Sequence, residues 1–199
     1  MTSFTRAELE SFRDAEVPDL LPGPGDPVLR LLFVGINPGL WTAATSTHFA
    51  HPGNRFYPAL LRAGILAEPV DPASGMTEAD RDRLRGAGIG ITNVVRRATA
   101  KASELGPEEQ RAGGTELAAL VRRTRPTVVA IAGITAYRTA FGHPKAVMGR
   151  QPDAEGGPFE GTELWVVPNP SGLNAHETVE TLAAAYAAPA RAAGVLSSR

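Results

Sequence analysis

The sequence contains no cysteine among its 199 residues. This absence excludes disulfide bonds, thiol nucleophiles, zinc sites built on cysteine and iron–sulfur clusters. It also fits a reducing compartment, so we expect a cytoplasmic protein. Among the four histidines no metal-ligand spacing is found, and the sequence predicts no metal site and no cofactor.

Long apolar runs are also missing, and residues 1–10 are polar. We therefore expect neither a membrane span nor a signal sequence. A hydrophobic content of 43% and a charged content of 21% are typical of soluble globular proteins. A chain of 199 residues is long enough for one domain with a full core and too short for a second sizeable domain.

A basic excess is the third feature that the sequence lacks, since its formal net charge is −1. Proteins that bind nucleic acid without specificity usually carry such an excess, because neutralising phosphates drives their affinity. Composition alone therefore counts against nucleic acid as a partner, and any positive surface must be local. Solvated surface charge is the simplest interpretation of the two candidate patches, which are Arg96-Arg97 with Lys101 and Arg122-Arg123 with Arg125.

Apolar runs of strand type alternate with segments of helical spacing from residue 31 onward. Buried strands are expected at residues 31–34, 89–92, 127–132 and 164–167. Helices are expected after the capping residue Asn54 and at residues 78–84, 107–123, 135–141 and 177–192. This alternation predicts an α/β fold, a three-layer α/β/α sandwich with a central, mostly parallel sheet.

Residues 1–26 read differently from the rest of the chain. A short helix at residues 7–14 is followed by four prolines up to Pro27, which prevent regular structure. We expect a partly irregular N-terminal extension over residues 1–26, followed by a single domain over residues 27–199, and a monomer.

One short phrase occurs twice, each time directly after a buried-strand pattern. Gly35-Ile36-Asn37-Pro38-Gly39-Leu40 follows the first predicted strand, and Asn169-Pro170-Ser171-Gly172-Leu173 follows the last. Asn, Pro and Gly are favoured turn residues, so each copy alone is consistent with a plain turn. The carboxyl ends of strands, however, are where ligands bind in open α/β sheets. The two copies therefore predict one bipartite site, and each presents a leucine that we expect to be exposed.

Two further blocks complete a pattern that resembles a known family. They are His-Phe-Ala-His-Pro-Gly-Asn-Arg-Phe-Tyr from His48 and Gly-Ile-Thr-Asn-Val-Val from Gly90. With the two Asn-Pro phrases they occur in the order seen in the mismatch-specific uracil-DNA glycosylase and thymine-DNA glycosylase family, over about residues 31–186. The resemblance implies a uracil-DNA glycosylase-like fold and, in a bacterium, association with the nucleoid. It also implies a partner, double-stranded DNA that contains a damaged or mismatched pyrimidine.

The resemblance implies a role for each matching residue. Asn37 orients the attacking water, Phe49 stacks on a base rotated out of the duplex, and Leu173 fills the vacated stack. The base pocket is expected to comprise Ile36, Gly39, Thr42, Phe49 and Asn93. The wedge and duplex contact are expected to comprise Asn169, Ser171, Gly172, Leu173 and Asn174.

Elementary chemistry constrains this implied reaction, uracil excision that starts base excision repair. An amide orients water but cannot deprotonate it, so the reaction must rely on departure of the base. The departing uracil anion can be held by backbone N–H groups near Ile36 and Gly39. No lysine stands in a motif position, so Schiff-base chemistry and strand cleavage are not expected.

Three positions depart from the family pattern. Ala175 stands where some relatives place an arginine, which puts the contact to the opposite strand and a strict guanine preference in doubt. Tyr57 replaces a frequent tryptophan, and Thr42 faces the pyrimidine 5-substituent, where it can disfavour thymine. Uracil opposite guanine is the expected main substrate, with ethenocytosine and thymine as further candidates.

Two other classes of function remain open on the sequence. A lesion-recognition module with little turnover would keep Phe49 and Leu173 in their roles and use Asn37 only as a turn residue. A small-molecule nucleosidase or nucleotide-binding protein fits the near-neutral charge, and it would have no need for Leu173.

Overall fold

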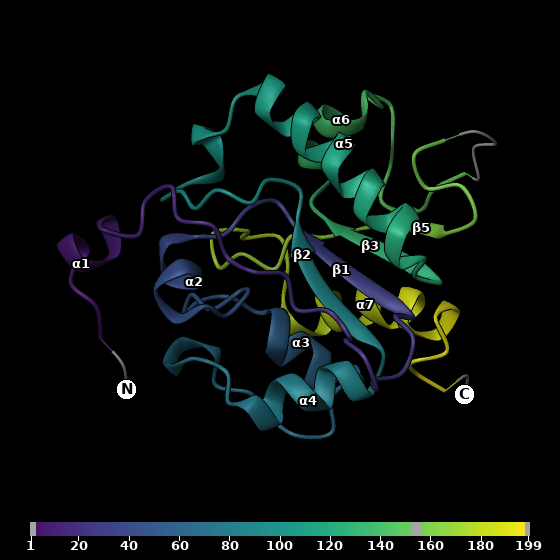
Figure 1. The fold of residues 1–199 in the computed structure, drawn as a ribbon, viewed down its shortest axis with the longest axis horizontal. Helices are drawn as coiled ribbons and strands as arrows, with labels where there is room; N and C mark the ends of the chain where they lie inside the picture. Colours follow the sequence, from purple (N-terminus) through teal and green to yellow (C-terminus); the bar gives the residue numbers. More distant parts are fainter. Residues whose placement is uncertain (1–2, 153–156, 198–199) are drawn as a thin grey trace.

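The computed structural model describes residues 3–152 and 157–197. Its sheet has the strand order β2-β1-β3-β5-β4, in which the first four strands are parallel and β4 pairs antiparallel with β5 (Figure 1). The strands are β1 (Leu31–Gly35), β2 (Ile89–Asn93), β3 (Val128–Ala132), β4 (Gly149–Arg150) and β5 (Glu163–Val167). The helices are α1 (Arg6–Glu10), α2 (Leu40–Thr45), α3 (Phe56–Arg62), α4 (Glu78–Gly86), α5 (Pro107–Thr124), α6 (Ile134–Phe141) and α7 (Val179–Ala192), with short 3-10 turns at Pro72–Ser74 and Ala102–Glu104.

Helices cover both faces of the sheet, with α5 and α6 on one side and α3, α4 and α7 on the other (Figure 1). Successive side chains of a strand point to opposite faces, so β1 supplies both cores. Leu31 and Phe33 pack with α3 and α7, and Leu32 and Val34 pack with α5. This two-sided burial is why β1 reads as a continuous apolar run.

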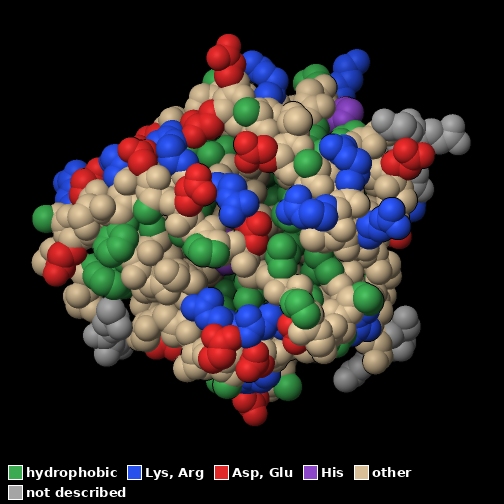
Figure 2. All heavy atoms as spheres, viewed as in Figure 1, with side chains coloured by type: hydrophobic (Ala, Val, Ile, Leu, Met, Phe, Trp, Pro, Cys, Tyr) green, Lys and Arg blue, Asp and Glu red, His purple; other side chains and the backbone are tan. Residues whose placement is uncertain are grey.

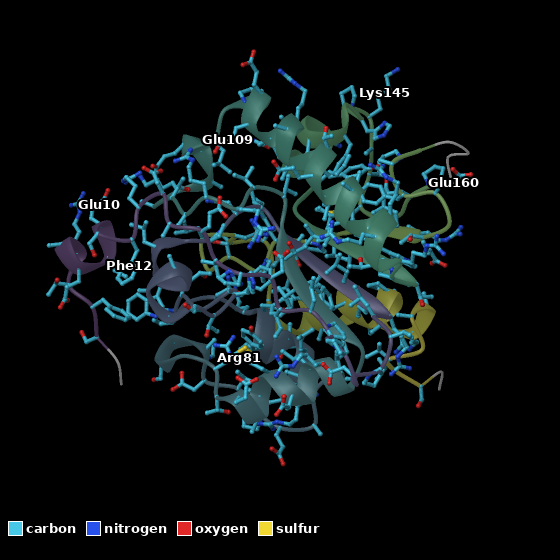
Figure 3. All side chains as sticks on the ribbon, in the orientation of Figure 1. Glu10, Phe12, Arg81, Glu109, Lys145 and Glu160 are labelled. Atoms are coloured by element: carbon cyan, nitrogen blue, oxygen red, sulfur yellow. The ribbon has the colours of Figure 1, made fainter. Side chains whose placement is uncertain are left out.

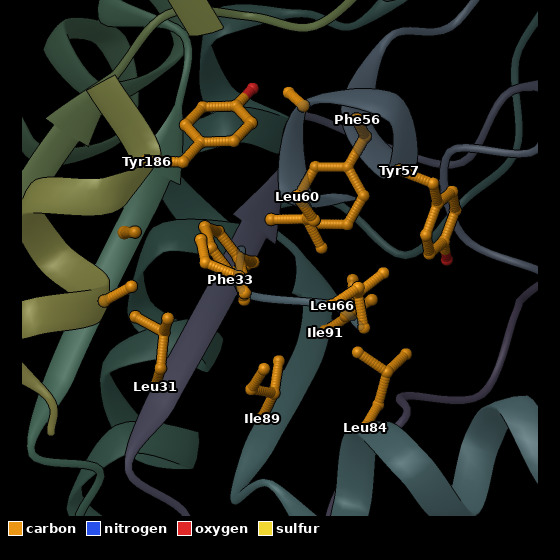
Figure 4. Packing of buried hydrophobic residues seen from close by; sticks show 14 of the residues in the cluster. Leu31, Phe33, Phe56, Tyr57, Leu60, Leu66, Leu84, Ile89, Ile91 and Tyr186 are labelled. Atoms are coloured by element: carbon orange, nitrogen blue, oxygen red, sulfur yellow. The ribbon is translucent and has the colours of Figure 1, made fainter. Parts of the chain in front are cut away.

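The core beneath α3 and α7 is rich in aromatic rings (Figure 4). Phe33 meets Phe56 edge-on, with ring centroids 5.1 Å apart, and Tyr186 lies 5.7 Å from Phe33. The hydroxyl of Tyr186 donates to the Pro168 carbonyl at 3.0 Å, and the hydroxyl of Tyr57 donates to the His48 carbonyl at 3.0 Å. The core thereby anchors the two segments that contain Pro168 and His48.

The predicted fold class is confirmed, since the sheet is mostly parallel and lies between two helical layers. The predicted strands and long helices agree with the structure to within a few residues. Four elements were not predicted: α2, which follows Gly39 directly, the two-residue edge strand β4 and the two 3-10 turns. None of the helices in the described part of the chain is long and apolar enough to cross a membrane.

The N-terminal segment lies against β2 and extends the edge of the sheet. Leu20 and Ile91 exchange two backbone hydrogen bonds, of 2.9 and 2.7 Å, and Val17 and Leu20 are buried. Phe12, labelled in Figure 3, packs with the small cluster that contains Leu40 and Ala43 of α2. Residues 14–20 are therefore an integral part of the wall beside β2, although residues 1–26 read as an extension in the sequence.

Acidic and basic side chains are interspersed over the face seen in Figure 2. Arg97 pairs with Asp14 at 2.6 Å and with Glu109 at 2.7 Å, and Arg96 pairs with Asp19 at 3.4 Å. The first candidate basic patch is thus largely neutralised by neighbouring carboxylates. The second candidate patch lies at the C-terminal end of α5, just before the start of β3.

Candidate active site

A cavity of about 880 Å³ opens at the carboxyl ends of β1, β2 and β5, and both Asn-Pro phrases line it. The chain passes from β1 to β2 on one side and later to β3 on the other, so β1 lies at a topological switch point of the sheet. Gly133, which follows β3, separates the two phrases. A Cβ on Gly133 would lie 3.4 Å from Ile36 and 3.9 Å from Asn169. The predicted bipartite arrangement is therefore present at the carboxyl ends of the strands.

The side-chain amide of Asn37 is fixed by its nitrogen. Nδ2 donates to Oγ1 of Thr99 at 2.8 Å, to the Pro38 carbonyl at 3.0 Å and to the Arg97 carbonyl at 3.1 Å. Thr99 is buried, and its own hydroxyl donates to the Lys101 carbonyl at 2.9 Å. Both amide hydrogens are therefore used, and Oδ1 is the end of the group that is available to a donor in the cavity.

Gly35 allows Asn93 and Phe49 to approach the end of β1. A Cβ at this position would lie 2.4 Å from Oδ1 of Asn93 and 3.2 Å from the Phe49 ring. Phe49 has a φ of 56°, which is uncommon for an aromatic residue, and its ring stacks on Phe56 with centroids 4.1 Å apart. Phe49 thus packs on the core and also lines the cavity.

Asn93 is buried, and its amide is paired with a buried histidine. Nδ2 of Asn93 lies 3.1 Å from Nδ1 of His48, and Nε2 of His48 lies 3.0 Å from the Pro18 carbonyl. Desolvation lowers the pKa of His48, and this effect outweighs the bond to Pro18 and the nearby Asp19 carboxylate. The imidazole is therefore neutral at pH 7.

The remaining residues expected in the base pocket also line the cavity: Ile36, Gly39 and Thr42. Thr42 is buried on α2, and its hydroxyl accepts a long 3.4 Å hydrogen bond from the Ala50 amide. His51 lies at the rim, where its ring meets Trp41 edge-on at 6.1 Å.

The second Asn-Pro phrase is a compact turn at the mouth of the cavity. Oδ1 of Asn169 accepts the Ser171 amide at 3.0 Å, and the Asn174 side chain donates to the Asn169 carbonyl at 3.2 Å. Leu173 at the tip is 92% exposed. Asn169, Ser171, Gly172 and Leu173 line the cavity, whereas Asn174, expected in the same group, braces the turn and does not line it.

Arg55 ties this turn to the start of α3. Its guanidinium donates to the backbone carbonyls of Ser171 at 2.9 Å, Asn174 at 2.8 Å and Glu177, and its backbone amide donates to Pro170 at 3.0 Å. Gly172 makes a second close approach, because a Cβ there would lie 2.5 Å from the Gly53 carbonyl oxygen. The exposed leucine is therefore carried on a loop with fixed backbone.

The two leucines of the repeated phrase differ, which corrects the expectation that both are exposed. Leu40 begins α2 and is 9% exposed, in the cluster with Val17 and Ala98. The first phrase leads into a helix whose apolar side faces the N-terminal segment, whereas the second leads into an irregular turn with no core beside it. Of these two leucines, only Leu173 presents its side chain to solvent.

Three contributors were missed by the sequence analysis: Thr99, Arg55 and the pairing of His48 with Asn93. Arg55 stands inside a quoted motif, which could have drawn attention to it. Thr99 and Asn37 are 62 positions apart, and their contact has no local signal in the sequence.

No group of three or more His, Cys, Asp or Glu side chains that could hold a metal ion is found within residues 3–152 and 157–197. A second cavity of about 750 Å³ lies between α6 and the segment before β5, and it contains none of the motif residues. The larger cavity is lined by amides, hydroxyls, aromatic rings and the side chains of His51 and Arg55.

The family model described as the Uracil DNA glycosylase superfamily matches residues 22–188. The match includes β1 to β5 and both Asn-Pro phrases.

Proposed function

The chain belongs to the uracil DNA glycosylase superfamily, and we propose that it is a monofunctional glycosylase that removes uracil from mismatches with guanine. Membership supports a hydrolase of N-glycosidic bonds that acts on DNA. The proposal adds the lesion, the rotation of the base into the cavity and the role of each side chain. Its main support is the orientation of Asn37, which leaves Oδ1 to the cavity.

Asn37 is the proposed catalytic residue. Oδ1 accepts a hydrogen bond from a water molecule and so turns a lone pair of that water toward the sugar carbon. An amide is not basic enough to deprotonate water, so the glycosidic bond must stretch first and the water collapses onto an oxocarbenium-like sugar. Phe49 provides the ring on which the rotated base stacks, and the cavity is large enough for a pyrimidine.

Departure of the base requires stabilisation of negative charge on uracil. Ile36 and Gly39 line the cavity beside the end of β1, and the backbone N–H groups near them are the proposed donors. Cytosine is a poorer leaving group, so chemistry that depends on departure favours uracil. No metal or lysine participates in this proposal.

Leu173 is the proposed wedge. An apolar side chain on a fixed loop fills the space that a base leaves when it is rotated out of the stack. Its 92% exposure in the free protein also argues against a small-molecule nucleosidase, because a nucleoside has no stack to fill. The side chain of Ala175 offers no hydrogen bond to the opposite strand, which is why the identity of the opposing base belongs in the test.

Release of free base from labelled duplexes tests the proposal. The panel carries uracil, thymine or ethenocytosine opposite guanine or adenine, with wild type, Asn37→Ala and Asn37→Asp. We expect fastest release from uracil opposite guanine and a loss of at least about a hundredfold in Asn37→Ala. Full activity of Asn37→Ala would remove the catalytic assignment. Tight binding of lesion DNA without base release would favour the recognition module instead.

A further inference from the structure

We propose that His48 and the Pro18 carbonyl act as a positioning pair that fixes the side-chain amide of Asn93 and thereby sets which pyrimidine edge the cavity accepts. The proposal rests on the proposed function, because it concerns how the same cavity selects its base. His48 is a positioning residue, since it contacts Asn93 and is buried behind it.

The hydrogen-bond pattern determines the tautomer of His48. A backbone carbonyl only accepts, so the 3.0 Å contact between Pro18 O and Nε2 of His48 requires a proton on Nε2. A neutral ring then has no proton on Nδ1, which must accept. The partner at 3.1 Å is the Asn93 amide, so it presents Nδ2 to His48.

The surroundings of His48 keep the ring neutral. The side chain is 4% exposed, and burial lowers its pKa. The charged groups that face it are the Asp19 carboxylate, which favours the imidazolium, and the more numerous guanidinium groups of Arg81 and Arg96, which oppose it. Arg81 projects from α4, and it donates to the Ser46 carbonyl at 3.4 Å (Figure 3).

The Pro18 carbonyl is a fixed reference point because the two residues that follow it are bonded to β2. Leu20 pairs with Ile91 through two backbone bonds. The Asp19 carboxylate accepts the Thr92 hydroxyl at 2.7 Å, one residue before Asn93. The N-terminal segment thus anchors the end of β2 and the ring of His48 together.

A fixed amide gives the cavity a defined polarity. With Nδ2 directed at His48, Oδ1 of Asn93 lies beside Gly35, where a Cβ would approach it to 2.4 Å, and Asn93 lines the cavity. Oδ1 can accept from the N3–H of uracil or thymine. The N3 of cytosine is itself an acceptor, so the two lone pairs would face each other.

The tautomer can be measured without any substrate. Long-range 1H–15N spectra of protein labelled with 15N-histidine distinguish Nε2–H from Nδ1–H rings, and His48 is assigned by the signal missing in His48→Phe. Should that variant fail to fold, the assignment follows from single Phe replacements of His51, His143 and His176. We expect a neutral Nε2–H ring at pH 7. A ring protonated on Nδ1 would overturn the proposal.

Base selection is measured with 5-fluorouracil and 5-fluorocytosine opposite guanine, because fluorine improves both leaving groups and the two bases differ only along the edge that Asn93 meets. We expect His48→Phe to reduce the preference for fluorouracil by about tenfold or more. His48→Asn places an acceptor near the position of Nδ1 and should restore much of the preference. His143→Phe is the matched control for the exchange of an imidazole for a phenyl ring.

The outcomes separate this proposal from the proposed function. Equal losses on both bases, with an unchanged ratio, would make His48 a purely structural residue and contradict the inference. Failure of wild type to release either base would instead reject the glycosylase assignment and, with it, the selective role, while the tautomer measurement would still report on the geometry of the pair.

Discussion

Nδ2 of Asn37 donates a 2.8 Å hydrogen bond to Oγ1 of Thr99, which is bonded in turn to the Lys101 carbonyl. Thr99→Val keeps the shape of the side chain and removes this link, while Thr99→Ser keeps the hydroxyl. A net hydrogen bond contributes about 1 kcal/mol, so we expect base release to slow by about fivefold in Thr99→Val and to change little in Thr99→Ser. Single-turnover rates measure the effect. Equal rates for both variants would show that Arg97 and Pro38 are sufficient to orient Asn37.

Arg55→Lys should loosen the turn that carries Leu173. A lysine ammonium is a point donor and cannot reproduce the planar fork that reaches the carbonyls of Ser171, Asn174 and Glu177. We expect kcat/KM on paired duplex to fall by about tenfold, mainly through KM. Arg62→Lys, an exposed change on the same helix, is the control. A comparable loss in Arg62→Lys would point to nonspecific charge effects.

Leu173→Ala should weaken activity on paired duplex more than on single strands. Burying a leucine side chain is worth about 1.5–3 kcal/mol, which corresponds to roughly ten- to a hundredfold on duplex. Val28→Ala is the control. Val28 is 79% exposed and lies before the amino end of β1, away from the cavity, so activity on both substrates should be unchanged. The wedge role is contradicted if duplex and single strand lose activity equally.

Thr42→Ala should improve removal of thymine relative to uracil. Thr42 is buried and lines the cavity, so a smaller side chain makes room for the 5-methyl group. We expect the ratio of thymine to uracil release to rise by about tenfold, since one methyl group in an apolar site is worth about 1–3 kcal/mol. Thr45→Ala on the same helix, outside the cavity, is the control. An unchanged ratio in Thr42→Ala would contradict the hypothesis that Thr42 limits the space for the 5-methyl group.

Stability should fall as the pH drops below about 6.5, the ordinary pKa of a histidine in an unfolded chain, because burial lowers the pKa of His48 in the folded state. The unfolded chain then binds a proton that the folded protein does not. The free energy of unfolding therefore decreases with falling pH, by up to about 1.4 kcal/mol per pH unit for one proton, until the pH reaches the lowered folded pKa.

Urea unfolding at pH 7.5 and 5.5 measures this dependence. His48→Phe lacks the titrating group, so its loss between the two pH values should be smaller than that of wild type. His143→Phe should retain the wild-type slope. A wild-type slope in His48→Phe would assign the dependence to other groups.

Much of the fold could be predicted because the strands are buried on both faces. The run at residues 31–34 has no polar interruption, and Pro107 marks the start of α5 clearly. The helix α2 was missed because it has six residues, contains Thr42 and Thr45, and follows a turn motif without a capping side chain. Its stability comes from packing on residues near Val17, which the local pattern does not contain.

The candidate site could be predicted in part, because some of its residues belong to short local motifs. Asn37, Phe49, Asn93 and Leu173 stand at strand ends or in turns, where short motifs mark them. The contacts that orient them join distant parts of the chain: Thr99 to Asn37, and Pro18 through His48 to Asn93. Such contacts depend on the register of β2 beside β1 and on the path of the N-terminal segment, and both are set by tertiary packing.

Arg55 and the close contact between Gly172 and Gly53 also determine whether the Leu173 turn loses its conformational entropy on folding or on binding. A flexible tip would lose its conformational freedom at each encounter with DNA, and every such loss would weaken binding. Here the freedom is already lost when the protein folds. In the proposed reaction, the leucine and the cavity therefore meet each base pair at a constant separation, which the fold of the free protein already sets.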